Sequence, residues 1–152
     1  MYLEFIFIDL LLIHIFFQMF YDFIDIFPLN NIQNIIQVRT FKERLFLSFL
    51  HALPSLMTLT LSLIYFGESK PLGVVIFFIF YFGTSLTLIF LNWYAPYLWG
   101  TTETKKEIIE TEFKDTYQIL PVHRDNPRPN ALLVILHSLF LINSFIMIRL
   151  GF

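Results

Sequence analysis

The sequence predicts an all-α, multi-pass membrane protein with four transmembrane helices and a short cytoplasmic, interfacial amphipathic helix. Three observations lead to this fold class. Hydrophobic residues make up 57% of the 152-residue chain and charged residues only 14%, whereas a soluble domain carries about 25% charged residues. The apolar residues fall into four long runs, and Lys and Arg are concentrated in two of the connectors between them. At this length we expect a single membrane domain covering residues 1–152.

The four apolar runs reach the length of about 20 residues that a helix needs to cross a bilayer. They cover residues 5–27, 45–66, 72–98 and 131–150. A mean hydropathy of +0.68 over the whole chain agrees with insertion into lipid. The N-terminus has neither the basic start nor the small-residue cleavage site of a signal peptide, so we expect the first run to be retained.

The first run carries a polar stripe. Glu4, His14, Gln18, Asp22 and Asp25 fall on one helical face, and Asp9 opposes them. A spanning helix turns such a stripe toward protein partners, and we favour this interpretation over a helix lying in the membrane interface. It predicts contact between Asp22 or Asp25 and a nearby cation, Arg44 or Arg39.

Basic residues predict the orientation of the chain. The 28–44 and 99–130 connectors hold eight of the ten Lys and Arg residues, and only Lys70 and Arg149 lie elsewhere. Because cytoplasmic loops are enriched in Lys and Arg, we expect both connectors in the cytoplasm and both termini outside. The expected location is a bacterial plasma membrane, with the lipid bilayer as the first partner.

The second run has small polar residues at alternating spacings of three and four, which places them on one narrow helical face. This pattern is typical of close helix–helix packing, and the alternative is a wet or ligand-lined face. Pro54 lies within this run and leaves the carbonyl of Leu50 without a donor. The residues of the face are Ser48, His51, Ser55, Thr58 and Ser62.

Local signals define the segment between the third and fourth runs. Pro96 frees the carbonyl of Asn92, so the third helix is expected to break there. Thr104 and Glu107 have the spacing of a capping box, and an amphipathic helix is expected to follow with an apolar stripe that reaches Tyr117. Asn130 is a suitable N-cap for the last span.

Two histidines suggest a polar pocket. His51 and His137 lie at similar depths in their spans, and intramembrane ionisable residues are functional candidates. Asn92 and Tyr94 approach the same layer, and Asp125 or His123 would cap it from the loop. The alternative is that each histidine only bonds to a neighbouring hydroxyl or carbonyl. The candidate ligand-binding residues are therefore His51, Asn92, Tyr94, Asp125, Asn130 and His137.

Other kinds of chemistry have little support in the sequence. The chain has no cysteine, and no HExxH-like ligand pair or G-x-S-x-G turn is present. We therefore expect no metal and no cofactor, assign no catalytic residue, and favour a protein that is not an enzyme. The net charge of −2 gives no reason to expect nucleic acid as a partner.

Two stretches of the chain carry a resemblance. They are Trp93-Tyr94-x-Pro96-Tyr97-x-x-Gly100 and, after Leu120-Pro121, Asp125-Asn126-Pro127-x-Pro129-Asn130 followed by His137. This pattern resembles a set of small, uncharacterised bacterial integral membrane proteins and covers about the last 60 residues. That set shows a histidine ahead of the Leu-Pro pair, where this chain has Thr116 and Tyr117. The resemblance implies relatives without implying a mechanism.

Together these features predict a binding or transport-type module. A cytoplasm-facing pocket with histidines would take a small polar ligand, an ion or protons. The alternative is an accessory or structural membrane subunit whose 92–130 block docks a partner protein. In either case we expect a homo-oligomer or a partner membrane protein.

Overall fold

The computed structural model describes residues 2–150, and these residues form helices and connecting loops with no β-strand. Four helical segments are long and apolar enough to cross a membrane. The predicted all-α, polytopic fold class is confirmed. The segments are α1 (Tyr2–Phe20), α3 (Phe41–Ile64), α4 with η1 and α5 (Leu72–Trp99), and α7 (Ala131–Arg149).

The first two spans differ from their predicted bounds because of local hydrogen bonds. Helix α1 ends at Phe20 rather than near residue 27, and the Asn30 side chain donates to the free carbonyls of Tyr21 and Ile24. Helix α3 starts at Phe41, four residues before the predicted start, because Thr40 and Glu43 form a capping box. Asp22 and Asp25 thus lie in a turn and not in the span.

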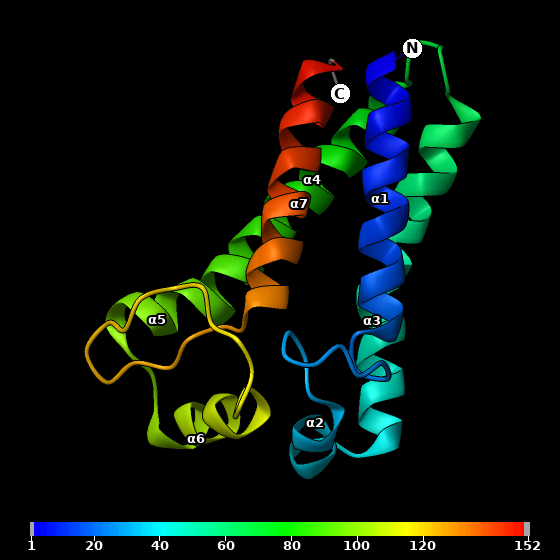
Figure 1. Ribbon diagram of the computed structural model, residues 1–152. Coiled ribbons are helices and arrows are strands. Elements are labelled where there is room, and N and C mark those ends of the chain that lie inside the picture. Colours follow the sequence, from blue (N-terminus) through cyan, green and yellow to red (C-terminus); the bar gives the residue numbers. More distant parts are fainter. Residues whose placement is uncertain (1, 151–152) are drawn as a thin grey trace.

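Figure 1 shows the helices diverging from one end of the bundle to the other. α1 packs against both α3 and α7, whereas α4 crosses behind them diagonally and moves away from α3. The start of α1 and the end of α7 lie together at one end, named here the termini end. The opposite end, named the loop end, holds both long connectors (Figure 1).

The termini end is closed by packed side chains. Its centre consists of aromatic rings and aliphatic chains from α1, α4 and α7. Phe82 lies between Phe7 and Phe140, with ring centroids 6.1 and 5.0 Å away. Glu4 and Lys70 form an ion pair at this end, with 3.1 Å between Oε1 and Nζ. The buried members of the core are Phe7, Leu11, Ile15, Phe78, Tyr81, Phe82, Phe140 and Met147.

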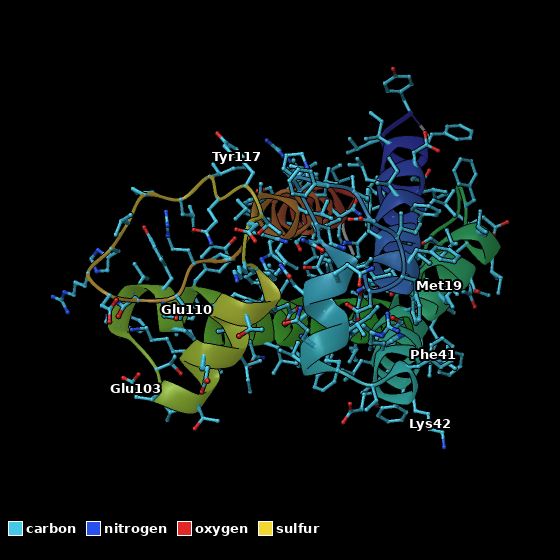
Figure 2. All side chains as sticks on the ribbon, turned by 60° about the horizontal axis from the view of Figure 1, so that its bottom comes forward. Met19, Phe41, Lys42, Glu103, Glu110 and Tyr117 are labelled. Carbon is cyan, nitrogen blue, oxygen red and sulfur yellow. The ribbon has the colours of Figure 1, made fainter. Side chains whose placement is uncertain are left out.

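The loop end is closed by two short helices, α2 (Ile32–Val38) and α6 (Glu103–Glu112), which pack against each other. Figure 2 looks onto this end, where α2 lies between α6 and the start of α3, marked by Phe41 and Lys42. Ile35 of α2 is fully buried, and the Asn34 side chain donates to the carbonyl of Lys114.

The predicted capping box of α6 is wrong. The helix begins at Glu103 because the Thr102 side chain accepts from the backbone N–H of Lys105, so Thr104 and Glu107 lie inside the helix. The helix also ends before Tyr117, whose backbone N–H donates to the carbonyl of Pro28 instead. By contrast, Asn130 caps α7 as predicted, accepting from the N–H of Leu133.

Proline alters the third span where the sequence predicts a break. The α-helical turn widens into a π-helix, η1 (Phe90–Tyr94), before the chain continues as α5 (Ala95–Trp99). Because Pro96 donates no hydrogen bond to Asn92, the helix takes up an extra residue there rather than ending.

Candidate functional site

A cavity of about 730 Å³ occupies the loop-end half of the bundle. Its volume falls within the range of small-ligand pockets, roughly 300–1,000 Å³. It lies where α4 has moved away from α3, and α1, α7, α2 and α6 supply its remaining walls. Most of the wall is apolar, so its polar side chains stand out. These are His14, Gln18, Tyr21, Asp22, Arg39, Ser48, His51, Tyr81, Thr84, Ser85, Asn92, Trp93, Glu112 and His137.

The ceiling of the cavity is a hydrogen-bond chain across three helices. The Ser55 hydroxyl donates to Gln18 Oε1 of α1 at 2.6 Å and lies 2.6 Å from the Tyr81 hydroxyl of α4. Tyr81 therefore donates to Ser55. The ring of Tyr81 also meets Phe140 of α7 edge-on, with 5.7 Å between centroids.

Ser55 divides the polar face of α3 between the two roles expected from sequence. Toward the termini end, Thr58 and Ser62 donate to carbonyls of their own helix and are buried. Toward the loop end, Ser48 and His51 line the cavity. The face thus packs along one half and lines a pocket along the other.

The floor of the cavity is one guanidinium shared by two carboxylates. Arg39 Nη2 donates to Glu112 Oε2 at 2.7 Å, and Arg39 Nη1 lies 3.5 Å from Asp22 Oδ2. Arg39 is the C-cap residue of α2, Asp22 follows α1, and Glu112 ends α6. This triad therefore ties three segments together beneath the cavity.

Burial controls the ionisation of the triad. Only 2% of the Glu112 side chain is exposed, and this burial raises its pKa to about 7, opposed by Arg39 and reinforced by the charge of Asp22. Burial also raises the pKa of Asp22, although Arg39, Arg44 and His51 act in the opposite direction. Near neutral pH, Glu112 therefore exchanges a proton while held against Arg39.

The contact predicted between the end of the first run and a basic residue is confirmed. Arg39 reaches the Asp22 side chain. Arg44 is also close, but its Nη1 donates to the backbone carbonyl of Asp22 at 2.7 Å. The Arg44 guanidinium lies over the rings of Phe23 and Phe41, at 5.2 and 5.8 Å from their centroids, and this residue is not among those that line the cavity.

One wall of the cavity is exposed. Leu50, Leu53 and Met57 of α3 are 43–49% exposed, and they face Phe80 and Leu88 of α4, which are 68% and 57% exposed. These five residues, named here the mouth, border the gap between the two diverging helices. The border of the gap is mainly apolar, although exposed Thr84 and His51 also line the cavity there, whereas the floor is charged.

Several polar atoms around the cavity have no hydrogen-bond partner. They are Nδ1 of His14, Nδ1 of His137 and Oδ1 of Asp22, and all three are buried. His14 lies beside Phe140, with 5.0 Å between ring centroids, so the two histidines belong to the wall where α1 meets α7. An unsatisfied buried polar group costs about 1–3 kcal/mol, and an occupant that forms hydrogen bonds would relieve this cost.

The structure brings together half of the candidate residues named from sequence. His51, Asn92 and His137 line the same cavity. Tyr94 lies beside His137, with 5.6 Å between ring centroids, and together they line a smaller hollow of about 230 Å³ outside this cavity.

The other two candidates lie away from the cavity. Asp125 is 96% exposed and forms an ion pair with Lys106. Asn130 is fully buried and joins segments, because its amide donates to the Leu29 carbonyl while its oxygen caps α7.

The two stretches that carry the resemblance, within residues 93–100 and 120–130, bond to each other, and these contacts hold the loop before α7 against α5. The Asn126 amide donates to the carbonyl of Tyr97 at 2.9 Å, and the Tyr97 hydroxyl donates to the carbonyl of Pro121 at 3.1 Å. Gly100 has φ of +89°, and a Cβ there would lie 3.2 Å from Asn126 Oδ1. These contacts give the motif a structural role outside the cavity.

Sequence reasoning missed Glu112 and named His14 only as part of the polar stripe of the first run. A signal for Glu112 existed, because it lies three residues from Ile109 and next to Phe113, both buried on the inner side of α6. Its partner Arg39 comes from α2, a seven-residue helix that is too short to show a clear periodicity.

Within residues 2–150, no group of three His, Asp or Glu side chains is placed to hold a metal ion. Comparisons with protein-family models, with curated proteins and with solved structures find no match to this chain. The function proposed below therefore rests on the arrangement of the residues alone.

Proposed function

We propose that the protein is a binding or transport-type module of a membrane, whose cavity takes a small polar or cationic ligand, or protons. The observation that carries this proposal is the cavity of about 730 Å³, whose floor holds two buried carboxylates against a partly exposed guanidinium and whose wall holds unpaired imidazole nitrogens. If every polar group around the cavity had a hydrogen-bond partner, the network would be purely structural. Polar groups without such a partner favour a bound ligand in the cavity.

The proposal includes an orientation. Eight Lys and Arg residues lie in residues 28–44 and 99–130, which form the loop end with the first turn of α3, against two in the rest of the chain. This distribution supports a loop end in the cytoplasm of a bacterial plasma membrane. Reporters fused after Phe152 and within residues 101–116 are expected on opposite sides of the membrane. A C-terminal reporter that reads cytoplasmic would overturn this orientation.

A homo-oligomer, or a complex with another membrane protein, is also part of the proposal. The span Leu72–Trp99 is the least covered of the four by the rest of the chain. Its outer face is therefore available to a second copy or to a partner as well as to lipid.

The test uses Trp93, which lines the cavity, as a fluorescent reporter. The chain has two tryptophans, and the other, Trp99, is 70% exposed, so a Trp99→Phe protein in lipid vesicles reports on the cavity. We expect its emission to titrate between pH 5 and 8 and to respond to methylammonium. Both responses should change in His51→Gln and His137→Gln but not in Glu110→Gln, whose exposed side chain lies outside the cavity.

A second candidate function is docking of a partner protein by the 92–130 block. The observation that favours it is the exposure of large apolar side chains there, with Trp99, Tyr117 and Val122 61–72% exposed. If Trp93 responds to neither pH nor methylammonium, while substitutions in residues 125–130 abolish a cellular phenotype, docking replaces ligand binding as the function.

A further inference from the structure

The open side of the cavity faces the part of the membrane that holds hydrocarbon. The mouth residues come from the middle of α3 and α4, two helices long and apolar enough to span. A water-soluble ion has no favourable path across such a rim, because removing a charge from water is costly. A molecule already dissolved in the bilayer can pass between the two helices.

The charged groups of the cavity lie at its floor, whereas its open side is bordered mainly by apolar side chains. Asp22, Arg39 and Glu112 form the floor, and His51 lies on α3 one turn below Ser55 of the ceiling. On α3 the cavity lining extends from Leu47 to Met57, eleven residues that rise by roughly 15 Å along the helix. The charged floor and the mainly apolar mouth match a molecule with a polar head at the loop end and an apolar tail that lies in the mouth.

The unpaired carboxylate oxygen of the floor favours a head group that donates hydrogen bonds. Arg39 is shared by two carboxylates, and Asp22 Oδ1 has no hydrogen-bond donor. Arg44 does not supply that donor, since its Nη1 bonds to a backbone carbonyl and its Nε is unpaired. A head group with N–H donors and one positive charge satisfies the free carboxylate oxygen and shares Glu112 with Arg39.

We propose that the cavity binds a monocationic amphiphile, an ammonium with an alkyl or aryl tail, which enters from the bilayer between α3 and α4 and places its nitrogen at Asp22 and Glu112. This inference rests on the proposed function and specifies its ligand. The occupant also competes with the proton on Glu112. The groups that face this competition are Asp22 and Tyr21 after α1, Arg39 of α2, Arg44 and His51 of α3, and Glu112 of α6.

The test compares probes with one tail and different heads. The full chain with Trp99→Phe is placed in vesicles of zwitterionic lipid at pH 8, where Glu112 has lost most of its proton. The probes are derivatives of dodecylammonium, dodecanoate and dodecanol that carry bromine on the sixth carbon. Bromine quenches a tryptophan in contact with it, and Trp93 lies near the proposed head group, beside Phe113 with 5.6 Å between ring centroids. We expect saturable quenching of Trp93 by the ammonium, at concentrations at least tenfold lower than for the other two.

Variants and pH locate the head group. Asp22→Asn and Glu112→Gln should each weaken the ammonium probe about tenfold, while Glu110→Gln, at an exposed position on the same helix, should leave its affinity unchanged. Lowering the pH from 8 to 5.5 should weaken binding of the ammonium probe to the protein that keeps Glu112, but not to the Glu112→Gln variant. The comparison of the three head groups needs no substitution in the floor of the cavity. It therefore tests the proposal even if a floor variant fails to fold.

The outcomes separate this inference from the proposed function. If Trp93 responds to pH or methylammonium but the three tailed probes quench it equally, the cavity binds a polar ligand or protons. The proposal of an amphiphilic ligand is then wrong. Stronger quenching by dodecanoate than by the ammonium would assign the floor to an anionic head and overturn the proposal. If Trp93 responds to none of these probes, both the amphiphile and the proposed function fail.

Discussion

The two ends of the bundle hold the same helices in opposite ways. At the termini end, aromatic rings fill the space between α1, α4 and α7, and an ion pair, Glu4–Lys70, lies at the edge. At the loop end the helices are apart, and the Arg39 triad joins the segments beneath a cavity. The difference teaches that mainly apolar packing closes this bundle where the helices meet, whereas charged side chains close it where they diverge.

The comparison is not perfect, because the closed end also buries a polar group without a partner. Asn143 of α7 is fully buried, and both its amide nitrogen and its oxygen lack hydrogen bonds. The polar residues of α3 at this level, Thr58 and Ser62, are satisfied within their own helix. Of the buried polar atoms without a partner, those of His14, Asp22 and His137 belong to residues that line the cavity, whereas Asn30 Oδ1, Arg44 Nε and the amide of Asn143 lie outside its lining.

The largest effect is expected from removing the shared guanidinium. Arg39→Ala should lower the free energy of unfolding in detergent at pH 8 by about 3 kcal/mol, because it leaves two buried carboxylates without their partner. Asp22→Asn in the same protein should recover part of the loss. Chemical unfolding followed by circular dichroism measures both changes.

Lys42→Ala is the matched control for that prediction. Lys42 is an exposed basic residue near the start of α3, and its removal should change the stability by less than about 0.5 kcal/mol. If Arg39→Ala behaves like Lys42→Ala, the triad does not hold the loop end together, and the contrast between the two ends disappears.

The pH dependence of stability should come from the loop end. The pKa of Glu112 is raised to about 7 in the folded protein, so between its ordinary range and about 7 the folded state binds more protons than the unfolded state. The free energy of unfolding should therefore fall as the pH rises through this window, by roughly 2–3 kcal/mol. The raised pKa of Asp22 acts in the same direction.

Glu112→Gln is the variant that checks this prediction. It removes the titrating group and should flatten the profile of melting temperature against pH between 5 and 8. Glu110→Gln should keep the slope of the unsubstituted protein, because Glu110 is exposed. A stability that rises over this range in the unsubstituted protein would show that Glu112 is ionised well below pH 7.

The smallest effect compares two leucines, one from each end. Leu11 is fully buried in the packed core, and Leu11→Ala should cost about 2 kcal/mol because it leaves a cavity. Leu53 is 43% exposed at the mouth, so Leu53→Ala should cost only a few tenths of a kcal/mol. Equal losses, measured by unfolding in the same detergent, would mean that the mouth is packed as tightly as the core.

The sequence predicted the features that depend on neighbouring residues or on helical periodicity. The four spans, the N-cap at Asn130 and the disruption ahead of Pro96 are of this kind, and the structure contains each of them. The contact of Asp22 with a basic residue also followed, because Arg39 lies only 17 positions away. Boundaries failed where side chains capture free carbonyls, as Asn30 does after α1.

The floor of the cavity was beyond such reasoning. Glu112 and Arg39 are separated by 73 positions, and no local pattern indicates that α6 folds back onto α2. The motif residues Asp125 and Asn130 seemed to belong with the histidines because they are close in sequence to the last span. The structure uses them elsewhere, in an exposed ion pair and in a helix cap.

The separation of Arg39 and Glu112 along the chain also has a consequence for biosynthesis. Translation at about 5–20 residues per second places roughly 4–15 s between the synthesis of Arg39 and that of Glu112. Asp22 and Arg39 emerge close together, so the first pair of the floor can form while the third span is still being made. The nascent chain thus keeps its loop end open until α6 leaves the ribosome, and closing the floor is among the last steps of assembly.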